Sequence, residues 1–479
     1  MNPLIQLKQT TPVFLIAFLL TCLAIPWSAQ ADNDDPPPAV TPPTGMLVRQ
    51  QNPERELKQV LEQIDQGQIE NDIRKLVSFG TRHTLSSQTD PDRGIGAATN
   101  WIFTTLQGYA AASNGRMTVA LQSFVQPPGP RIPVATTITN VVATIQGSLT
   151  PNRIYIASGH IDSRVTDVLN FTSDAPGADD DASGVAVSME LARILSQHSP
   201  ESTIVLTAVA GEEQGTFGSI FQANGYKASG ADIQGMFSND IVGASKSDQG
   251  VSDAHRVRLF SEGVPTFDPP HSPSFNTLRI LVGGENDSQS RQLTRFVKSV
   301  ANNDETAMTV WNIWRRDRYL RASDHVSYQA VGYPAARFTE PNENFNHEHQ
   351  DVRVENGVQF GDLIDFVDFA YVARIAKVNA AALWSLSQGP GTPKNAQIVA
   401  SVLTNSTTMT WDANTDPDLA GYEIVWRETT ASDWTNAIPV GNVTTATLPI
   451  APKDNFQFGV RAVDTDGHHS PVAFPVTVF

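Results

Sequence analysis

The chain has 479 residues, of which 40% are hydrophobic and 17% are charged, and this balance excludes an intrinsically disordered protein. The formal net charge of -17 at pH 7 argues against binding to the phosphate backbone of nucleic acids and against an anionic membrane surface. The only cysteine, Cys22, lies near the N-terminus. Any metal site in the remainder of the chain is therefore expected to use His, Asp and Glu side chains.

The N-terminal segment is predicted to be a cleavable export signal. Its apolar run at 13–25 is too short to span a bilayer comfortably, and an Ala-x-Ala sequence ends at Ala31, as signal cleavage requires. We predict a signal peptide over 1–31, a secreted or periplasmic location, and no stable membrane span. The acidic, proline-rich sequence that follows predicts a linker over 32–53.

Hydrophobic periodicity predicts alternating helices and strands over 54–388. In chain order, the predicted elements are two short helices within 54–77, a helix at 95–106, strands at 118–125, 139–145 and 154–157, a helix at 185–195, a strand at 203–210, a helix opening at 217–224, strands at 234–242 and 278–281, a helix at 288–301, a strand at 335–339 and a long helix within 361–386. This alternation predicts an α/β domain with a mostly parallel mixed sheet flanked by helices on both faces.

The composition changes near the end of the long helix. Glycine and proline alternate at the start of 389–394, which predicts a linker. The segment 395–479 contains short stretches of alternating hydrophobicity separated by turn residues, which is typical of a small all-β sandwich.

The residues that could carry chemistry fall at the ends of predicted strands. They are His160 and Asp162 after the strand at 154–157, three aspartates at 179–181, Glu212 and Glu213 after the strand at 203–210, and Asp240 in the strand at 234–242. In a parallel sheet these ends lie at one edge, where ligands bind. Each acidic group alone would be an ordinary solvated turn. Gathered together they would repel one another and take up protons, and two divalent metals bridged by one carboxylate would relieve that repulsion.

Five motifs at and beyond these strand ends resemble a known family. They are GHID, PGADDDASG, AGEEQGTFGS, SNDIVG and SDHVSYQAVGYPAA, in this order. Together they resemble the M28 zinc metallopeptidases, the leucyl aminopeptidase or aminopeptidase Y-like family, over roughly residues 56–388. The resemblance implies a zinc-exopeptidase fold and two zinc ions as cofactors.

The resemblance also implies a set of zinc ligands. They are His160 and Asp240 on one ion, Glu213 on the other, and Asp180 bridging both. The family supplies one more histidine from a late loop, and FNHEHQD offers two. His349 is favoured, and His347 is the alternative.

Further roles follow from the same resemblance. Glu212 is implied to be the general base that activates a metal-bridging water or hydroxide. Asp162 is implied to orient the histidine ligand, and Asp181 follows the bridging aspartate, often across a cis peptide. Asp324 and His325, in the SDH motif, are implied to support the ligands or to position the substrate.

These implied roles describe an exported di-zinc exopeptidase that acts on peptides or proteins, with an aminopeptidase expected. The alternatives are a carboxypeptidase or other amide hydrolase on the same scaffold, and a secreted binding module with a non-catalytic metal site. The segment 395–479, with Trp411, YEIVW and FQFGVRAVDTDGHHSP, resembles a fibronectin type III domain. That resemblance implies binding to the substrate or to a surface, or a spacer role.

Overall fold

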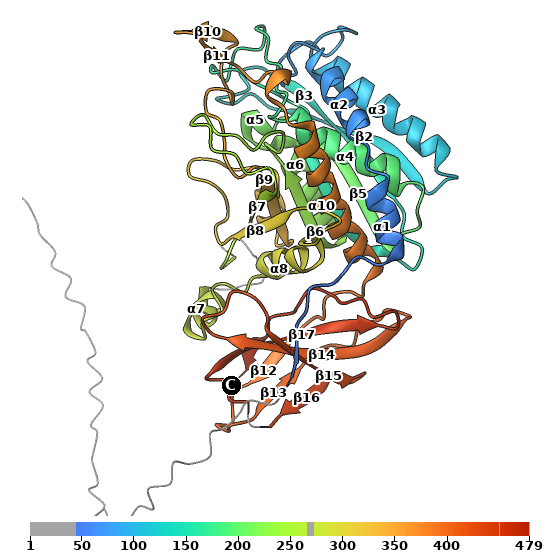
Figure 1. The fold of residues 1–479 in the computed structure, drawn as a ribbon, viewed down its shortest axis with the longest axis vertical. Coiled ribbons are helices and arrows are strands. Elements are labelled where there is room, and N and C mark those ends of the chain that lie inside the picture. Colours follow the sequence, from blue (N-terminus) through green and yellow to red (C-terminus); the bar gives the residue numbers. More distant parts are fainter. Residues whose placement is uncertain (1–44, 266–272, 450, 479) are drawn as a thin grey trace, which may run out of the picture. The chain divides into compact units, whose positions relative to one another are not determined.

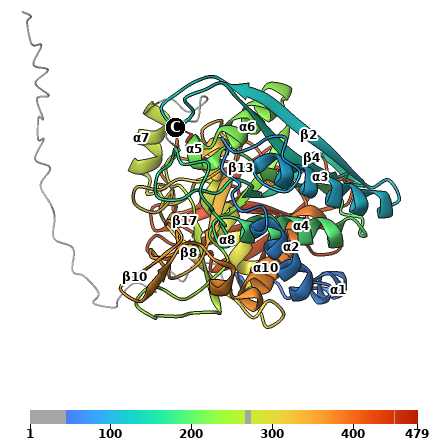
Figure 2. The same ribbon diagram turned by 90° about the horizontal axis from the view of Figure 1, so that it is seen from above.

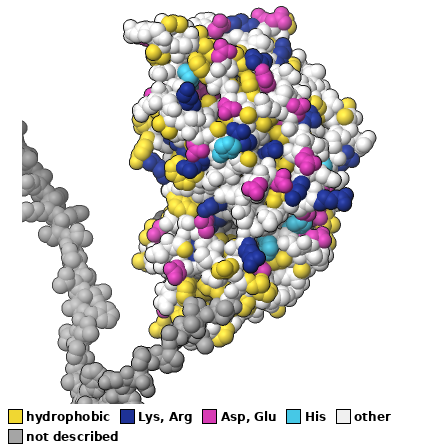
Figure 3. Space-filling view, viewed as in Figure 1, with side chains coloured by type: hydrophobic (Ala, Val, Ile, Leu, Met, Phe, Trp, Pro, Cys, Tyr) yellow, Lys and Arg dark blue, Asp and Glu magenta, His cyan; other side chains and the backbone are white. Residues whose placement is uncertain are grey.

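A computed structural model describes residues 45–265, 273–449 and 451–478. The predicted signal peptide at 1–31 lies outside the described residues, as does most of the predicted linker, so these assignments stay predictions. Within the described part of the chain, no helix is long and apolar enough to cross a bilayer. Acidic and basic side chains are interspersed on the face of the molecule that Figure 3 presents.

A mixed sheet of eight strands organises the first and larger part of the structure (Figure 1). Its strands are β2 (Met117–Gln126), β3 (Thr136–Ile145), β4 (Thr150–His160), β5 (Ser202–Val209), β6 (Asp232–Asn239), β7 (Arg256–Phe260), β8 (Thr309–Ile313) and β9 (Ala335–Thr339). Their order across the sheet is β2-β3-β5-β4-β6-β9-β7-β8. The central strands β5, β4, β6 and β9 are parallel to one another. β3 is antiparallel to both β2 and β5, and β7 is antiparallel to β9 but parallel to β8.

Helices cover both faces of this sheet. They are α1 (Arg55–Glu62), α2 (Gln66–Val77), α3 (Ile95–Ala112), α4 (Ala182–Leu195), α5 (Glu212–Gly215), α6 (Phe217–Ser229), α8 (Gln289–Ala301), α9 (His325–Gln329) and α10 (Phe369–Gln388). Helix α7 (Pro273–Leu281) instead contacts the last strand of the chain, β18 (Val476–Val478). Along β4, Tyr155 and Ala157 face the core under α2, α4 and α10, which lie side by side in Figure 2. Ile156 faces the opposite core, which Ala223 of α6 and Tyr328 of α9 share. The predicted α/β class, with a mostly parallel sheet between two helical layers, is confirmed.

Two predicted elements differ from the structure. The segment predicted as a strand at 278–281 (LRIL) is the end of helix α7, and Ile280 and Leu281 are 55% and 76% exposed. A run this short fits either structure. The long helix predicted within 361–386 begins only at Phe369, because Asp368 caps it by accepting the N–H of Tyr371 at 3.0 Å. The short helix η1 (Ile364–Phe366) and the hairpin of β10 (Arg353–Glu355) and β11 (Val358–Phe360) precede it.

The C-terminal part consists of two sheets that enclose one core, which confirms its all-β class. One sheet has the order β1-β15-β14-β17 and the other β16-β13-β12-β18. The strands are β1 (Met46–Leu47), β12 (Gln397–Val399), β13 (Thr407–Thr410), β14 (Leu419–Glu428), β15 (Asn436–Gly441), β16 (Thr445–Leu448), β17 (Phe456–Asp464) and β18 (Val476–Val478). Met409 from one sheet and Trp426 from the other are buried in the shared core. The resemblance to fibronectin type III stays a prediction.

One strand of this sandwich comes from the predicted linker. β1 pairs antiparallel with β15, with Met46 opposite Ala437. The extended linker sequence thus supplies an edge strand before helix α1 starts. The segment predicted as a linker over 32–53 therefore contains regular structure near its C-terminal end.

Polar contacts join the sandwich to the α/β part. The Arg427 guanidinium lies 2.7 Å from Asp287, which Arg295 contacts from the other side at 2.9 Å. The indole of Trp434 donates a hydrogen bond to Gln292 of α8 at 2.9 Å. Because Arg427 and Asp287 are buried, this contact is a fixed part of the structure.

Candidate metal centre

The carboxyl ends of β4, β5 and β6 meet at one edge of the sheet. His160 at the end of β4 pairs with Val209 at the end of β5. The start of α4 approaches this edge so closely that only glycine fits. A Cβ atom on Gly159 would lie 2.3 Å from the carbonyl carbon of Gly184, and one on Gly184 would lie 2.2 Å from the carbonyl oxygen of Asn239. These contacts bring the aspartates that precede α4 next to His160.

Two groups of metal-ligand side chains form at this edge, and they share Asp180. His160, Asp180 and Asp240 make one group, and Asp180, Glu213 and His349 make the other; within each group the donor atoms lie within 4.8 Å of one another. The Oδ1 atom of Asp180 is 3.1 Å from Nε2 of His160, and its Oδ2 atom is 2.8 Å from Nε2 of His349. Each oxygen of this carboxylate therefore faces a different group, as a bridging ligand does.

The donor atoms fit divalent metal ions. Nε2 of His160 and Oε1 of Glu213 are buried and have no hydrogen-bond partner among the described residues. Buried polar atoms of this kind are normally hydrogen-bonded. Imidazole nitrogens combined with carboxylate oxygens, without thiolates, are a ligand set that zinc accepts.

In the metal-free protein, histidines and carboxylates hold one another through charge. Burial alone would raise the pKa of Asp180, but His349 and His160 outweigh burial and keep that pKa well below its ordinary value. Burial alone would lower the pKa of His349, but Glu213 and Asp180 raise it to about 9. Metal binding must displace protons from these histidines, so metal affinity is expected to fall as the pH is lowered.

The three consecutive aspartates point to different partners. Asp179 accepts the N–H of Gly243 at 2.6 Å, while Asp180 faces the two histidines. Asp181 accepts the N–H of His160 at 2.8 Å and caps α4 by accepting the N–H of Gly184 at 3.0 Å. The Asp180–Asp181 peptide bond is cis, as the family resemblance implies. Separate partners explain how three adjacent carboxylates can lie together although Asp180 and Asp181 are buried.

Glu212 opens the short helix α5 directly after β5. Burial raises the pKa of its carboxyl group well above the ordinary value, and the nearby Asp240 and Asp324 add to the rise. Its backbone N–H donates to Asp162 at 3.2 Å. A glutamate with a raised pKa beside a metal centre has the properties of a general base.

Asp162 differs from the expectation in how it acts. His160 Nδ1 lies 2.9 Å from the backbone carbonyl oxygen of Asp162, whereas the carboxylate is 3.8 Å away. The carboxylate instead accepts the N–H of Glu213 at 2.9 Å and the hydroxyl of Thr84 at 3.2 Å. Asp162 therefore orients the histidine through its main chain and the two glutamates through its side chain.

The remaining predicted residues divide between the centre and its surroundings. The ring of His347 stacks on Phe366, with centroids 3.6 Å apart, and it belongs to neither donor group. Asp324 is fully buried, and neither of its carboxylate oxygens has a hydrogen-bond partner in the described residues. His325 lies 2.8 Å from the carbonyl oxygen of Arg316. The structure thus brings His349, and not His347, to the centre.

Sequence reasoning missed four arginines around the centre. Arg337 on β9 is buried and lies 2.7 Å from Oδ1 of Asp240. Burial alone would raise the pKa of Asp240, but Arg337 holds it below its ordinary value. The other three are Arg82, Arg164 and Arg321. Of the four, only Arg164 could have been placed near the centre from the sequence, because it lies four residues after His160.

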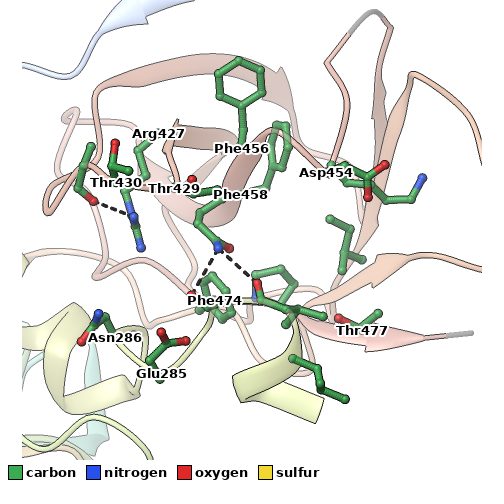
Figure 4. A pocket seen from close by; sticks show the side chains of 18 of the residues that line it. Glu285, Asn286, Arg427, Thr429, Thr430, Asp454, Phe456, Phe458, Phe474 and Thr477 are labelled. Carbon is green, nitrogen blue, oxygen red and sulfur yellow. Dashed lines mark hydrogen bonds between the residues drawn. The ribbon is translucent and has the colours of Figure 1, made fainter.

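A large cavity lies elsewhere in the described structure. It has a volume of about 820 Å³ and lies between Leu281 of α7 and Phe456 of the sandwich, and no residue of the two donor groups lines it. Gln457 lines this cavity and donates to the carbonyl oxygens of Val282 and Gly283. Phe456, Phe458 and Phe474 also line it (Figure 4). We place the reactive centre at the strand ends, because the donor atoms converge there.

Comparison with known proteins identifies the family. The family model described as peptidase family M28 matches residues 140–356, a range that contains both donor groups. A probable zinc metalloprotease of Leptosphaeria maculans is 52% identical over 423 residues, which is 88% of this chain and 97% of the relative. The chain belongs to peptidase family M28. A second relative, a probable zinc metalloprotease of Pyrenophora teres, is 49% identical over 456 residues, or 95% of this chain and 94% of the relative.

Among solved structures, this M28 peptidase is similar to the LapA aminopeptidase of Legionella pneumophila. The identity is 18% and the TM-score is 0.49, over 70% of this chain and 75% of that chain.

Proposed function

We propose that this M28 family member is a di-zinc exopeptidase, and specifically an aminopeptidase. One observation carries the proposal: the two oxygens of the buried Asp180 carboxylate each face a different group of metal-ligand side chains. Zinc is the metal we propose, because the ligand set suits it and because the similar fungal proteins are named probable zinc metalloproteases.

The proposed ligands follow from the two donor groups. His160, Asp180 and Asp240 would hold one ion, and Asp180, Glu213 and His349 the other. When bound, two zinc ions lower the pKa of a water molecule and polarise the carbonyl of the scissile bond. The buried Arg337 lies 2.7 Å from Oδ1 of Asp240, the oxygen that also faces Nε2 of His160 at 3.9 Å, and it therefore orients that carboxylate.

Glu212 is proposed to move the proton. Its carboxylate takes a proton from the attacking water and delivers it to the nitrogen of the leaving amine. The burial and the neighbouring carboxylates that raise its pKa make it a stronger base than an ordinary glutamate. The backbone N–H groups of Glu212 and Glu213 donate to the Asp162 carboxylate, and these hydrogen bonds fix the turn that carries the Glu212 side chain.

The preference for an N-terminus rests on Asp324. Neither oxygen of its buried carboxylate makes a well-aligned hydrogen bond in the described residues, although His160 and Ser219 are near enough to offset part of the rise that burial causes in its pKa. A buried carboxylate with so little compensation is costly. A substrate α-ammonium group would supply the opposite charge, and it would have to displace the side chains that cover the fully buried Asp324.

We also propose that the enzyme is exported, since a signal peptide is predicted over 1–31. On this proposal the catalytic domain covers 54–388, and the sandwich at 395–479 binds the substrate or a surface. Removing the sandwich would be a poor test, because Arg427 and Trp434 join it to the α/β part.

The test is hydrolysis of leucine p-nitroanilide and its N-acetyl derivative by the zinc-loaded protein. We expect cleavage of the free amine only, and a fall in kcat of about 10²- to 10⁴-fold for Glu212→Gln with zinc content unchanged. Equal cleavage of both substrates would contradict the aminopeptidase proposal. Near-normal turnover by Glu212→Gln would remove the role given to that residue.

A further inference from the structure

Two arginines converge on one atom at the edge of the candidate metal centre. Nη2 of Arg164 lies 2.6 Å from Nδ1 of His349, and Nη1 of Arg321 lies 3.2 Å from the same nitrogen. The side chains of these arginines are 17% and 25% exposed, so both are only partly covered. Two cationic groups therefore approach one ring nitrogen at a position that solvent reaches.

This arrangement contains more donors than the ring nitrogen can satisfy. An unprotonated imidazole nitrogen has one lone pair in the ring plane, so it accepts one hydrogen bond well. If Nε2 of His349 is a metal ligand, the neutral ring carries its proton on Nδ1. In that state Nδ1 accepts nothing, and both guanidinium groups lack a partner at this position.

Neither arginine is free to leave. Nε of Arg164 is held by Oε2 of Glu213 at 2.8 Å, and Nη1 donates to the carbonyl oxygen of Val165 at 3.1 Å. Nη2 of Arg321 is held by Glu348 at 2.8 Å. Each guanidinium thus keeps one edge fixed and presents unused N–H groups beside His349. Fixed, planar N–H donors of this kind match the two oxygens of a carboxylate.

We propose that Arg164 and Arg321 form a subsite for a carboxylate of the substrate, close to the scissile bond. This inference rests on the proposed peptidase function and adds a substrate class to it. In the proposed function Asp324 takes the substrate amine, whereas the arginines contact the His349 group. A substrate with an amine at one end and a carboxylate near the other, such as a dipeptide, matches both charges.

The carboxylate can have two sources. It is either the free C-terminus of a short peptide or the side chain of an Asp or Glu residue next to the scissile bond. The same donors would accept both, so matched ligands must separate them. Leu-Gly compared with Leu-glycinamide tests the terminal carboxylate, and Leu-Glu-amide compared with Leu-Gln-amide tests the side chain.

Binding is measured by isothermal titration calorimetry with zinc-loaded Glu212→Gln protein, in which the peptides stay intact. We expect one carboxylate ligand to bind about 10- to 100-fold more tightly than its amide, as charge-assisted hydrogen bonds imply. Adding Arg321→Met should reduce that ratio to below about threefold, and Arg321→Lys should restore part of it. The pair that shows the preference identifies the source of the carboxylate.

Arg315→Met is the matched control. Its guanidinium stacks on Tyr319, 3.6 Å from the ring centroid, in the same loop as Arg321. This variant should keep the full preference for the carboxylate ligand. Zinc content is measured for each variant, so a change in metal loading is seen directly.

Two results would overturn the subsite. One is equal binding of carboxylate and amide ligands in both pairs while Arg321 is intact, and the other is a preference that persists unchanged in Arg321→Met. The proposed function has its own readout, which is hydrolysis by the protein with Glu212 intact. If that protein cleaves no peptide, the peptidase proposal fails, while calorimetry still decides whether the arginines bind a carboxylate.

Discussion

Arg82 is the residue whose replacement tests the architecture of the centre most severely. Its side chain is 1% exposed. It donates to four backbone carbonyl oxygens: Leu76 at 3.2 Å, Ile161 at 2.7 Å, Pro176 at 2.6 Å and Gly177 at 2.8 Å. One guanidinium thus ties the end of α2 to the two loops that carry the proposed ligands.

Burial lowers the pKa of Arg82 to about 10, although Asp362 and Asp181 work against that fall. The group therefore stays charged at neutral pH, and it compensates part of the negative charge of the nearby aspartates. Ile161 directly follows His160, and Gly177 lies three residues before Asp180. By holding both backbone carbonyls, Arg82 fixes the spacing between these two ligands of one metal.

The magnitude follows from the contacts. Arg82→Met removes four hydrogen bonds, and each buried carbonyl left without a donor costs about 1–3 kcal/mol. Water entering the vacated space offsets part of this cost. We expect a net loss of about 3–5 kcal/mol in the free energy of unfolding, the range found when one partner of a buried charged network is removed. Arg82→Lys keeps the charge and some donors, so we expect about half that loss.

The assay is urea unfolding followed by tryptophan fluorescence, with zinc affinity measured by chelator competition. We expect zinc binding to weaken by about 10- to 100-fold, as when a residue that orients metal ligands is lost. Arg74→Met is the control, because the half-exposed Arg74 on α2 pairs with Glu70 and lies 5.4 Å from the ring centroid of Phe369, and its loss should cost less than about 1 kcal/mol. If the free energy of unfolding of Arg82→Met stays within about 1 kcal/mol of that of the unchanged protein, and the variant binds zinc normally, then Arg82 does not hold the ligand segments together.

Two further predictions concern histidines. His349→Ala should lose about one zinc per chain, and its kcat/KM should fall by at least about 100-fold. His347→Ala removes only a ring that stacks on Phe366 and should keep its zinc. Equal zinc loss in both variants would contradict the assignment of His349 as the ligand. The Asp464 hydrogen bond raises the pKa of His468 to about 9. A raised pKa means that the stabilisation is complete below pH 6.5, the ordinary value, and is lost as the pH rises towards 9. The Tm advantage over His468→Gln should therefore shrink across this interval, and a constant difference would contradict the prediction.

The sequence was informative where local pattern and position coincide. The continuous apolar run at 203–210 predicted a buried strand, and β5 is buried along its whole length. Because parallel strands place their carboxyl ends together, His160, Glu213 and Asp240 could be assigned to one edge before any coordinates were known. Those residues lie in the two donor groups.

What could not be predicted depends on contacts between distant segments. Arg337 stands in the short strand β9, where a charged residue would usually face solvent, yet it is buried against Asp240. Its role arises only when β9 is placed beside β6. Arg321 likewise meets His349 across a loop that no sequence period describes.

Some local assignments failed for a different reason. The segment at 278–281 carries no helical or strand period, since it is shorter than either pattern needs. The Asp162 side chain was assigned to His160, but the turn after β5 presents two N–H groups that it accepts instead. The spacing of residues in the sequence indicates which residues lie near a side chain. It does not indicate which atoms of those residues the side chain contacts.

The number of zinc ions bound per chain is the most direct test of a two-metal centre that is bridged by Asp180. It can be measured by inductively coupled plasma mass spectrometry on the purified protein after zinc loading and removal of excess metal. The two donor groups that share Asp180 predict about two zinc ions per chain, about one in His160→Ala, and almost none in Asp180→Ala. A protein that binds no more than one zinc, and binds it equally well after Asp180→Ala, would contradict the account.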